Sequence, residues 1–146
     1  MYFKGEYEHT IDAKGRVFVP AKFREGLGEE FVVCKGFFDE CLYVFSNEEF
    51  EEFSDKLNEL SFTNEDAQII ERELYTNAVD VSADKQGRAL IPQKLRSFAK
   101  IDKEVSIVGV RNHIEIWDKE KWNNRSVDSN ALRAAIRNLR ASGVKI

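Results

Sequence analysis

The chain has 146 residues, of which 33% are charged and 42% hydrophobic, with a formal net charge of −4 at pH 7. This length fits one ordinary globular domain or two small ones. No apolar run is long enough to cross a bilayer, and the N-terminal residues lack the pattern of a secretory signal. The only cysteines, Cys34 and Cys41, are too few for a disulfide framework, so we expect a reduced, cytoplasmic protein.

The first residues predict a strand, a tight turn, a second strand and a short helix. Tyr7, His9 and Ile11 alternate with polar residues, as in a half-buried strand. Pro20 ends the second strand and suits the first turn of a helix. We expect Gly26 to close that helix.

The turn has its own signature, Asp12-Ala-Lys-Gly15-Arg16. Asp at the first position and Gly at the last fit a type I turn, with the glycine left-handed in a three-residue hairpin loop. Asp12 and Arg16 would then be opposed cross-strand residues with their side chains on one face. The cations of this segment are Lys14, Arg16, Lys22 and Arg24.

Two strands and two acidic helices are expected next. The strands fall near residues 32–36 and 42–45, and Ser46 with Glu49 forms a capping box that opens a helix. A second helix is expected at about residues 64–76. Ten acidic residues stand against two basic ones from Glu48 to Glu73, so the remainder of the chain has a net positive charge.

The hairpin signature returns 72 positions later as Asp84-Lys85-Gln-Gly87-Arg88, again followed by a proline, Pro92. Self-similarity of this kind indicates a duplicated structural unit. The cations here are Lys85, Arg88, Lys94 and Arg96. Lys85 falls one place earlier than its counterpart, Lys14, so the second hairpin is expected to contact a ligand differently or to contact it less.

The C-terminal part repeats the later strands and ends in a helix. Residues 105–109 and 114–117 match the strands of the first unit, and a stripe of Leu132, Ala135, Ile136 and Leu139 predicts a helix that stops near Gly143. This stripe either packs on the core or contacts another subunit. From Lys119 onward seven cations stand against two acids, which indicates a mobile basic tail or a charged partner of the acidic helices.

The duplication sets the expected architecture. We predict two units, residues 1–76 and 77–146, each with about four short strands, a short helix after the proline and a longer helix after the last strand. Units of this size bury too little surface to be comfortably stable alone. The expected fold is therefore mainly β with flanking helices, in which the two units form one β-barrel core with pseudo-two-fold symmetry.

Catalytic and metal-binding patterns are lacking in the sequence. His9 is expected at the core or rim, His113 in a loop between strands, and Cys34 in a buried strand. These residues and Cys41 have no metal-ligand spacing, and no phosphate-binding loop or catalytic triad signature occurs. We expect no enzyme activity, no cofactor and no metal.

The duplicated Asp-x-x-Gly-Arg-x-Φ-Φ-Pro-x-Lys-Φ-Arg motif, where Φ is apolar, resembles the MraZ family over nearly the whole chain. That family has the SpoVT/AbrB-like swapped-hairpin fold. The resemblance implies a bacterial transcriptional regulator that forms rings and binds short direct repeats in the promoter of the division and cell-wall gene cluster. The positions that match its signature are Asp12, Arg16, Asp84 and Arg88.

Physical chemistry suggests roles for these residues. A two-stranded ribbon can enter the DNA major groove, where Arg16 and Arg88 would bind guanine. Asp12 and Asp84 would orient the arginines, while the glycines serve the turns. Lys14 and Lys85 would contact phosphate or a base edge; Lys22, Arg24, Lys94 and Arg96 would at most position the DNA backbone. An AbrB-like antitoxin and a non-DNA assembly scaffold are the alternatives, and we expect a nucleoid-associated protein.

Overall fold

The computed structural model describes residues 2–125 and 128–146. Its strands are β1 (Glu6–Thr10), β2 (Arg16–Phe18), β3 (Glu30–Lys35), β4 (Leu42–Ser46), β5 (Val79–Ser82), β6 (Arg88–Leu90), β7 (Glu104–Val110) and β8 (His113–Asp118). Its helices are α1 (Ala21–Leu27), α2 (Asn47–Ser61), α3 (Glu65–Asn77), α4 (Gln93–Phe98), α5 (Lys119–Asn124) and α6 (Ser129–Ala141). More of the chain is helical than extended, so the fold is mixed α/β and the expectation of a mainly β protein was wrong.

The larger sheet is antiparallel and has the strand order β1-β7-β8-β4-β3-β5. Exchanging the two repeats maps β1 onto β5, β7 onto β3 and β8 onto β4, which returns the same order reversed. The sheet therefore has the expected pseudo-two-fold symmetry, with its axis between β4 and β8. Each edge strand pairs with the other repeat, since β1 lies beside β7 and β5 beside β3.

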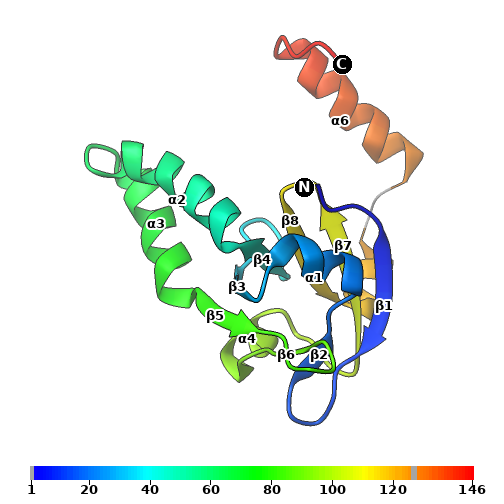
Figure 1. Ribbon diagram of the computed structural model, residues 1–146. Coiled ribbons are helices and arrows are strands. Elements are labelled where there is room, and N and C mark those ends of the chain that lie inside the picture. Colours follow the sequence, from blue (N-terminus) through cyan, green and yellow to red (C-terminus); the bar gives the residue numbers. More distant parts are fainter. Residues whose placement is uncertain (1, 126–127) are drawn as a thin grey trace.

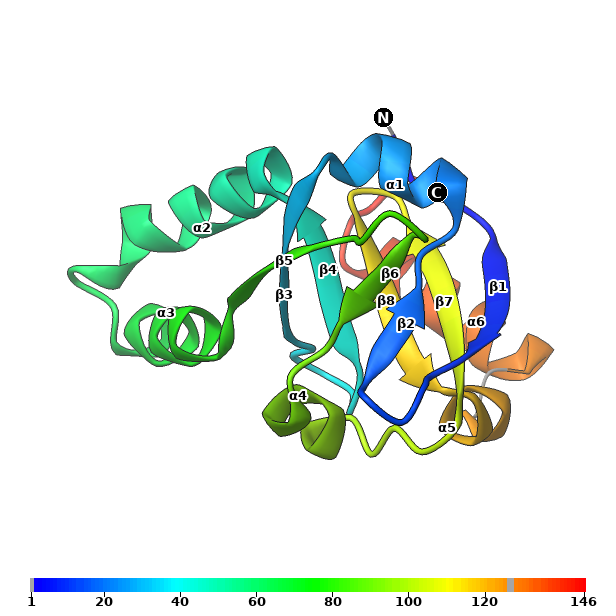
Figure 2. The same cartoon turned by 60° about the horizontal axis from the view of Figure 1, so that its bottom comes forward.

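The second sheet is a short ribbon of β2 and β6, one strand from each repeat. Figure 2 shows this ribbon lying across the larger sheet. Among the described strands, only the isolated bridges Ile11–Val17 and Ala83–Ala89 connect the ribbon to the edge strands. The described strands therefore form two sheets and not a closed barrel, which corrects the expected β-barrel core. Pro20 and Pro92 follow the ribbon strands and lack the N–H needed to extend the ladder, which keeps the ribbon short.

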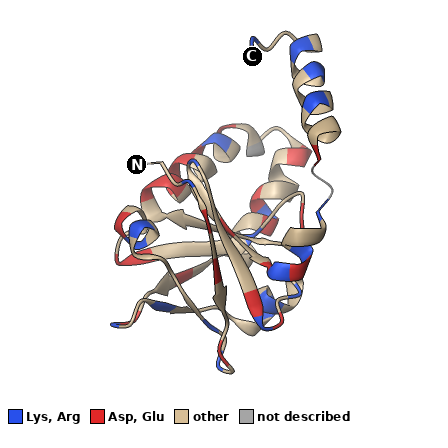
Figure 3. Ribbon diagram, turned by 90° about the vertical axis from the view of Figure 1, so that its right-hand side faces the viewer, with Lys and Arg blue, Asp and Glu red and all other residues tan. Residues whose placement is uncertain are grey.

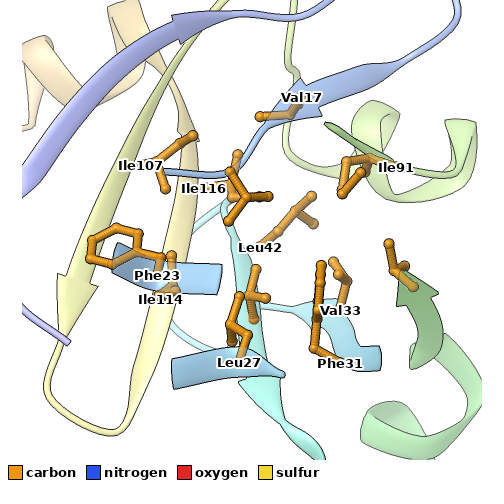
Figure 4. Packing of buried hydrophobic residues seen from close by; sticks show 14 of the residues in the cluster. Val17, Phe23, Leu27, Phe31, Val33, Leu42, Ile91, Ile107, Ile114 and Ile116 are labelled. Carbon is orange, nitrogen blue, oxygen red and sulfur yellow. The ribbon is translucent and has the colours of Figure 1, made fainter. Parts of the chain in front are cut away.

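One hydrophobic core lies between the two sheets and draws on both repeats. It includes Val17 and Phe31 from the first repeat and Ile91, Ile107 and Ile116 from the second, all at most 3% exposed. Figure 4 shows these side chains meeting from opposite sides of the core. Removing either repeat would expose the apolar side chains of the other, so the two repeats share a core as the sequence predicts.

The acidic helices α2 and α3 form a hairpin that projects from one side of the sheets (Figure 1). The Ser46 hydroxyl accepts a hydrogen bond from the Glu49 N–H at 3.1 Å, which confirms the predicted helix start. The Asn64 side chain caps α3 in the same way. Leu74 packs with Phe45 and Cys34, so the base of the hairpin has its own small apolar cluster.

Three features differ from the sequence prediction. Gly26 lies inside α1, and the helix instead ends at Gly28, which has a φ of +83°. The helix after the last strand of the second repeat is only the six-residue α5, with α6 as a separate helix. His113 lies within β8 and not in a loop. Within the described residues, no helix combines the length and apolarity needed to cross a membrane.

Candidate nucleic-acid interface

The two predicted turns have nearly identical geometry. The Gly15 N–H donates to the Asp12 carbonyl at 3.0 Å, and the Asp12 N–H donates to the Arg16 carbonyl at 3.0 Å. In the second copy the equivalent distances are 2.9 and 2.8 Å. Gly15 and Gly87 have φ values of +89° and +83°, a conformation that other residues rarely adopt. The left-handed glycines and the opposed Asp–Arg pairs are therefore confirmed.

Each aspartate holds both the loop and its arginine. Asp12 Oδ1 accepts from the backbone N–H groups of Lys14 and Arg16 at 3.0 and 2.9 Å, while Oδ2 accepts from Arg16 Nε at 2.7 Å. Asp84 repeats this arrangement with Gln86 and Arg88.

These bonds also fix the charge of the aspartates. The backbone N–H of Arg16 is the strongest influence that lowers the pKa of Asp12, and the N–H of Arg88 does the same for the pKa of Asp84. Hydrogen bonds donated to a carboxylate favour its ionised form. Both carboxylates therefore stay charged at neutral pH and keep their arginines oriented.

The ribbon presents one face to the core and one to solvent. Val17 and Ala89, which are paired across the ribbon, point inward and are at most 1% exposed. Arg16 lies opposite Leu90, and Arg88 lies opposite Phe18, on the outer face. About a third of each arginine side chain is exposed, 30% for Arg16 and 32% for Arg88.

The two repeats meet on this outer face. Arg88 Nη1 lies 3.9 Å from Asp12 Oδ2, so the carboxylate of one repeat attracts the arginines of both. The ribbon thus brings Arg16 and Arg88 from positions 72 residues apart onto a single surface. Figure 1 shows the loop between β1 and β2 projecting at this end of the molecule.

The sequence analysis missed Phe18 and Leu90 as members of this surface. Leu90 is 54% exposed beside Arg16, and the Phe18 ring lies 5.0 Å from the His9 ring. Both follow their arginine by two positions, and side chains two apart in a strand share a face. This alternation was the signal that could have identified them.

Arg24 and Arg96 have contacts that the sequence did not predict. Arg24 Nε donates to the Val19 carbonyl, and Arg96 Nε to the Ile91 carbonyl, each at 2.9 Å. A Cβ built on Gly15 would lie 2.7 Å from Arg96 Cζ. The equivalent atom on Gly87 would lie 2.9 Å from Arg24 Cζ. Each arginine therefore covers the hairpin loop of the other repeat.

The four lysines of the motifs, in contrast, are solvent-exposed. Lys14 and Lys85 lie in the hairpin loops, and Lys22 and Lys94 lie on α1 and α4. Within residues 2–125 and 128–146 none of the four forms an ion pair. Their charges are thus available to an anionic ligand.

Both cysteines are buried, and His113 pairs with a neighbouring glutamate. Burial raises the pKa of the Cys34 thiol to about 12 and also raises the pKa of Cys41. His113 Nε2 lies 2.9 Å from Glu115 Oε2, and Glu115 accepts a bond from the Trp117 indole. No cluster of three or more metal-ligating side chains occurs among the described residues.

Comparison with known proteins decides the family. The model of a family described as MraZ protein and antitoxin-like matches residues 2–73 and again residues 74–137. The chain belongs to the MraZ family. It is 54% identical to a relative from Carboxydothermus hydrogenoformans over 84% of this chain and 85% of that protein. Identity to the relative from Acetivibrio thermocellus is 50% over 92% and 93%, and to that from Finegoldia magna 54% over 87% and 88%.

Each of these relatives is named Transcriptional regulator MraZ. The MraZ family is not a family of enzymes, in agreement with the sequence prediction. The two matched segments correspond to the two hairpin motifs, so this chain contains two tandem MraZ units. The outer face of the β2–β6 ribbon, here called the outer ribbon surface, lies where those two units pair.

Proposed function

We propose that this protein is a sequence-specific DNA-binding transcriptional regulator that acts through the outer face of the β2–β6 ribbon. The observation that carries the proposal is the pair of arginines, Arg16 and Arg88, held on one exposed surface by ionised aspartates. A two-stranded ribbon fits the major groove of B-DNA, and arginine donates two hydrogen bonds to guanine O6 and N7. The names of the relatives support regulation of transcription.

The contacts with Asp12 and Asp84 prepare the arginines for binding. A side chain already fixed in its bound conformation loses less entropy when it contacts a base. Each aspartate accepts a hydrogen bond from Nε, the guanidinium nitrogen nearest the backbone. Arg88 Nη1 lies 3.9 Å from Asp12 Oδ2, beyond hydrogen-bond distance, so the terminal nitrogens can still donate to a base. Leu90, exposed beside Arg16, supplies an apolar surface suited to a thymine methyl group.

The lysines complete the proposed interface. Lys14 and Lys85 at the loop tips contact phosphate or a base edge, and Lys22 and Lys94 at most position the DNA backbone. Gln86 occupies the place of Lys14 in the second loop, so the two hairpins contact the DNA differently. Arg24 and Arg96 contribute mainly by covering the glycine loops, with any phosphate contact secondary.

The wider proposal follows from the family resemblance. The target is a set of short direct repeats in the promoter of the division and cell-wall gene cluster, and the protein is a nucleoid-associated homo-oligomer, for which the same resemblance implies a ring. We further propose the SpoVT/AbrB-like swapped-hairpin classification, with units at residues 1–76 and 77–146. The exchange of β1 and β5 between repeats supports this classification.

The test measures binding to a duplex that carries the direct repeats upstream of the protein's own gene. Wild type is compared with the Arg16→Ala/Arg88→Ala variant, and the oligomer size of each is recorded. Loss of binding with an unchanged oligomer supports the proposal, whereas wild-type affinity in the variant refutes it. Binding carried by phosphate contacts should weaken as salt rises, with a log–log slope of about −0.9 per neutralised phosphate.

The antitoxin alternative rests on the antitoxin-like description of the matching family. An antitoxin would bind a small toxin protein in addition to DNA. Copurification of the protein with a stoichiometric small partner from its native host would favour that function, and a scaffold would bind neither DNA nor toxin.

A further inference from the structure

The C-terminal helix α6 has an apolar face that the described chain leaves uncovered. Leu132 is 57% exposed and Leu139 is 45% exposed, and Ile136 lies between them on the same side. None of the residues of α6 is buried. Figure 1 shows α6 standing away from the sheets. An isolated helix of 13 residues is marginally stable in water. We therefore expect a partner to cover this apolar face.

The charged residues on the neighbouring face of α6 are all basic. Arg133 and Arg137 are four residues apart and Arg140 follows, with no acidic residue between Ser129 and Ala141. Figure 3 shows the blue bands on α6 without any red. Arg140 Nε donates to the Ile146 carbonyl. Within the described chain neither Arg133 nor Arg137 forms an ion pair, so the partner should be acidic.

Helix α2 has the complementary face. Glu52, Asp55, Glu59 and Phe62 follow one another at intervals of three or four residues, which places them on one side of the helix. This side lies opposite Phe53, which packs on the core cluster of the hairpin. Phe62 is 92% exposed. None of the three acids forms an ion pair within the described residues.

The two helices of one chain lie on different sides of the molecule. Figures 1 and 2 both place α6 on the β1–β7 side of the molecule, away from the sheets, and the α2–α3 hairpin on the opposite side. The basic face of α6 therefore lies apart from the α2 of its own chain. A contact between these two faces would join two copies of the chain.

We propose that α6 of one copy docks along α2 of a second copy. Arg133 and Arg137 face Asp55 and Glu59, while the apolar face of α6 covers Phe62. The contact joins two different surfaces of the same chain, and such head-to-tail contacts close into rings or extend into filaments. This inference rests on the proposal that the protein is a homo-oligomer and does not depend on DNA binding.

A charge swap tests the contact in the full-length protein without DNA. One variant carries Arg133→Glu and Arg137→Glu, and the other carries Asp55→Lys and Glu59→Lys. Each alone should associate at least about 10-fold more weakly than wild type, because attraction becomes repulsion at two pairs. An equal mixture should regain assembly, since each altered helix then meets an opposite charge. Sedimentation velocity measures the species, and circular dichroism verifies the fold.

The control variant carries Lys4→Glu and Lys103→Glu, which changes the net charge as much as the α6 variant does but at exposed sites elsewhere. It should assemble like wild type. The inference fails if both swap variants assemble like wild type, or if their mixture stays dissociated. If the α6 variant keeps its assembly but loses salt-sensitive DNA affinity, α6 is a phosphate contact and the inference is wrong. A monomeric wild type would refute the oligomer proposal as well.

Discussion

An arginine of each repeat covers the hairpin glycine of the other repeat, and we call this the exchange of arginines between repeats. It predicts an energetic coupling between Gly15 and Arg96. Gly15→Ala introduces a left-handed alanine, which costs about 1–2 kcal/mol, and places a Cβ 2.7 Å from Arg96 Cζ. Arg96 must then move away from Gly15, which strains or breaks the part-buried 2.9 Å bond from its Nε to the Ile91 carbonyl. An unpaired buried acceptor costs about 1–3 kcal/mol. The total loss of unfolding free energy should be about 2–5 kcal/mol.

A double-mutant cycle isolates the second contribution. In an Arg96→Ala background, Gly15→Ala should cost only the backbone strain, because there is no guanidinium left to displace. The two substitutions should therefore be non-additive by about 1–3 kcal/mol. The matched control is Arg24→Ala, since Arg24 contacts Gly87 and not Gly15. Its effect should add to that of Gly15→Ala.

Urea unfolding followed by circular dichroism at one protomer concentration provides the free energies, because association would otherwise change the apparent stability. Coupling of Gly15 to Arg24, or additivity with Arg96, would refute the exchange of arginines between repeats.

Three further predictions concern the aspartates, the thiols and the hairpin of helices. The folded-state pKa values of Asp12 and Asp84 are lowered. The stabilisation from their ionised carboxylates is therefore complete above the ordinary pKa of 3.8 and is lost as pH falls through the folded-state pKa. Carboxyl NMR titrations should give midpoints below 3.8, and a midpoint at or above it would contradict the hydrogen-bond assignment. Cys34 and Cys41 are buried and their thiol pKa values are raised, so a thiol reagent at pH 8 should label them only in denaturant; rapid labelling of the native protein would count against this packing. Leu74→Ala removes a side chain that is 2% exposed and should cost about 2–5 kcal/mol in urea unfolding, whereas Ile69→Ala, at a site 57% exposed, should change stability little; equal effects would contradict the packing of α3.

The sequence predicted the features that depend on neighbouring residues. The Asp-x-x-Gly turns form because Asp12 and Gly15 interact across only three peptide units. The capping of α2 by Ser46 is equally local. These structures could be inferred from one copy of the motif, and the second copy at Asp84 and Gly87 made the inference secure.

Features that depend on distant residues could not be read from the sequence. Pairing of β2 with β6 joins residues 70 to 74 positions apart. No local sequence pattern distinguishes this separate ribbon from strands of a closed barrel. From the sequence, Arg24 and Arg96 resemble solvated helix residues, because only the fold shows that they cover Gly87 and Gly15. The position of α6 is equally non-local, since its amphipathic pattern fits core packing as well as contact with another subunit.

Arg→Lys substitution tests most directly whether the outer face of the β2–β6 ribbon recognises DNA bases. The Arg16→Lys/Arg88→Lys variant keeps both charges but loses the bidentate donor geometry. Its affinity for the direct-repeat duplex should be divided by its affinity for a scrambled duplex at the same salt concentration. Each arginine–guanine pair contributes about 1–3 kcal/mol of discrimination, so this ratio should fall at least about 10-fold while scrambled-duplex binding persists. An unchanged ratio would contradict base reading by Arg16 and Arg88.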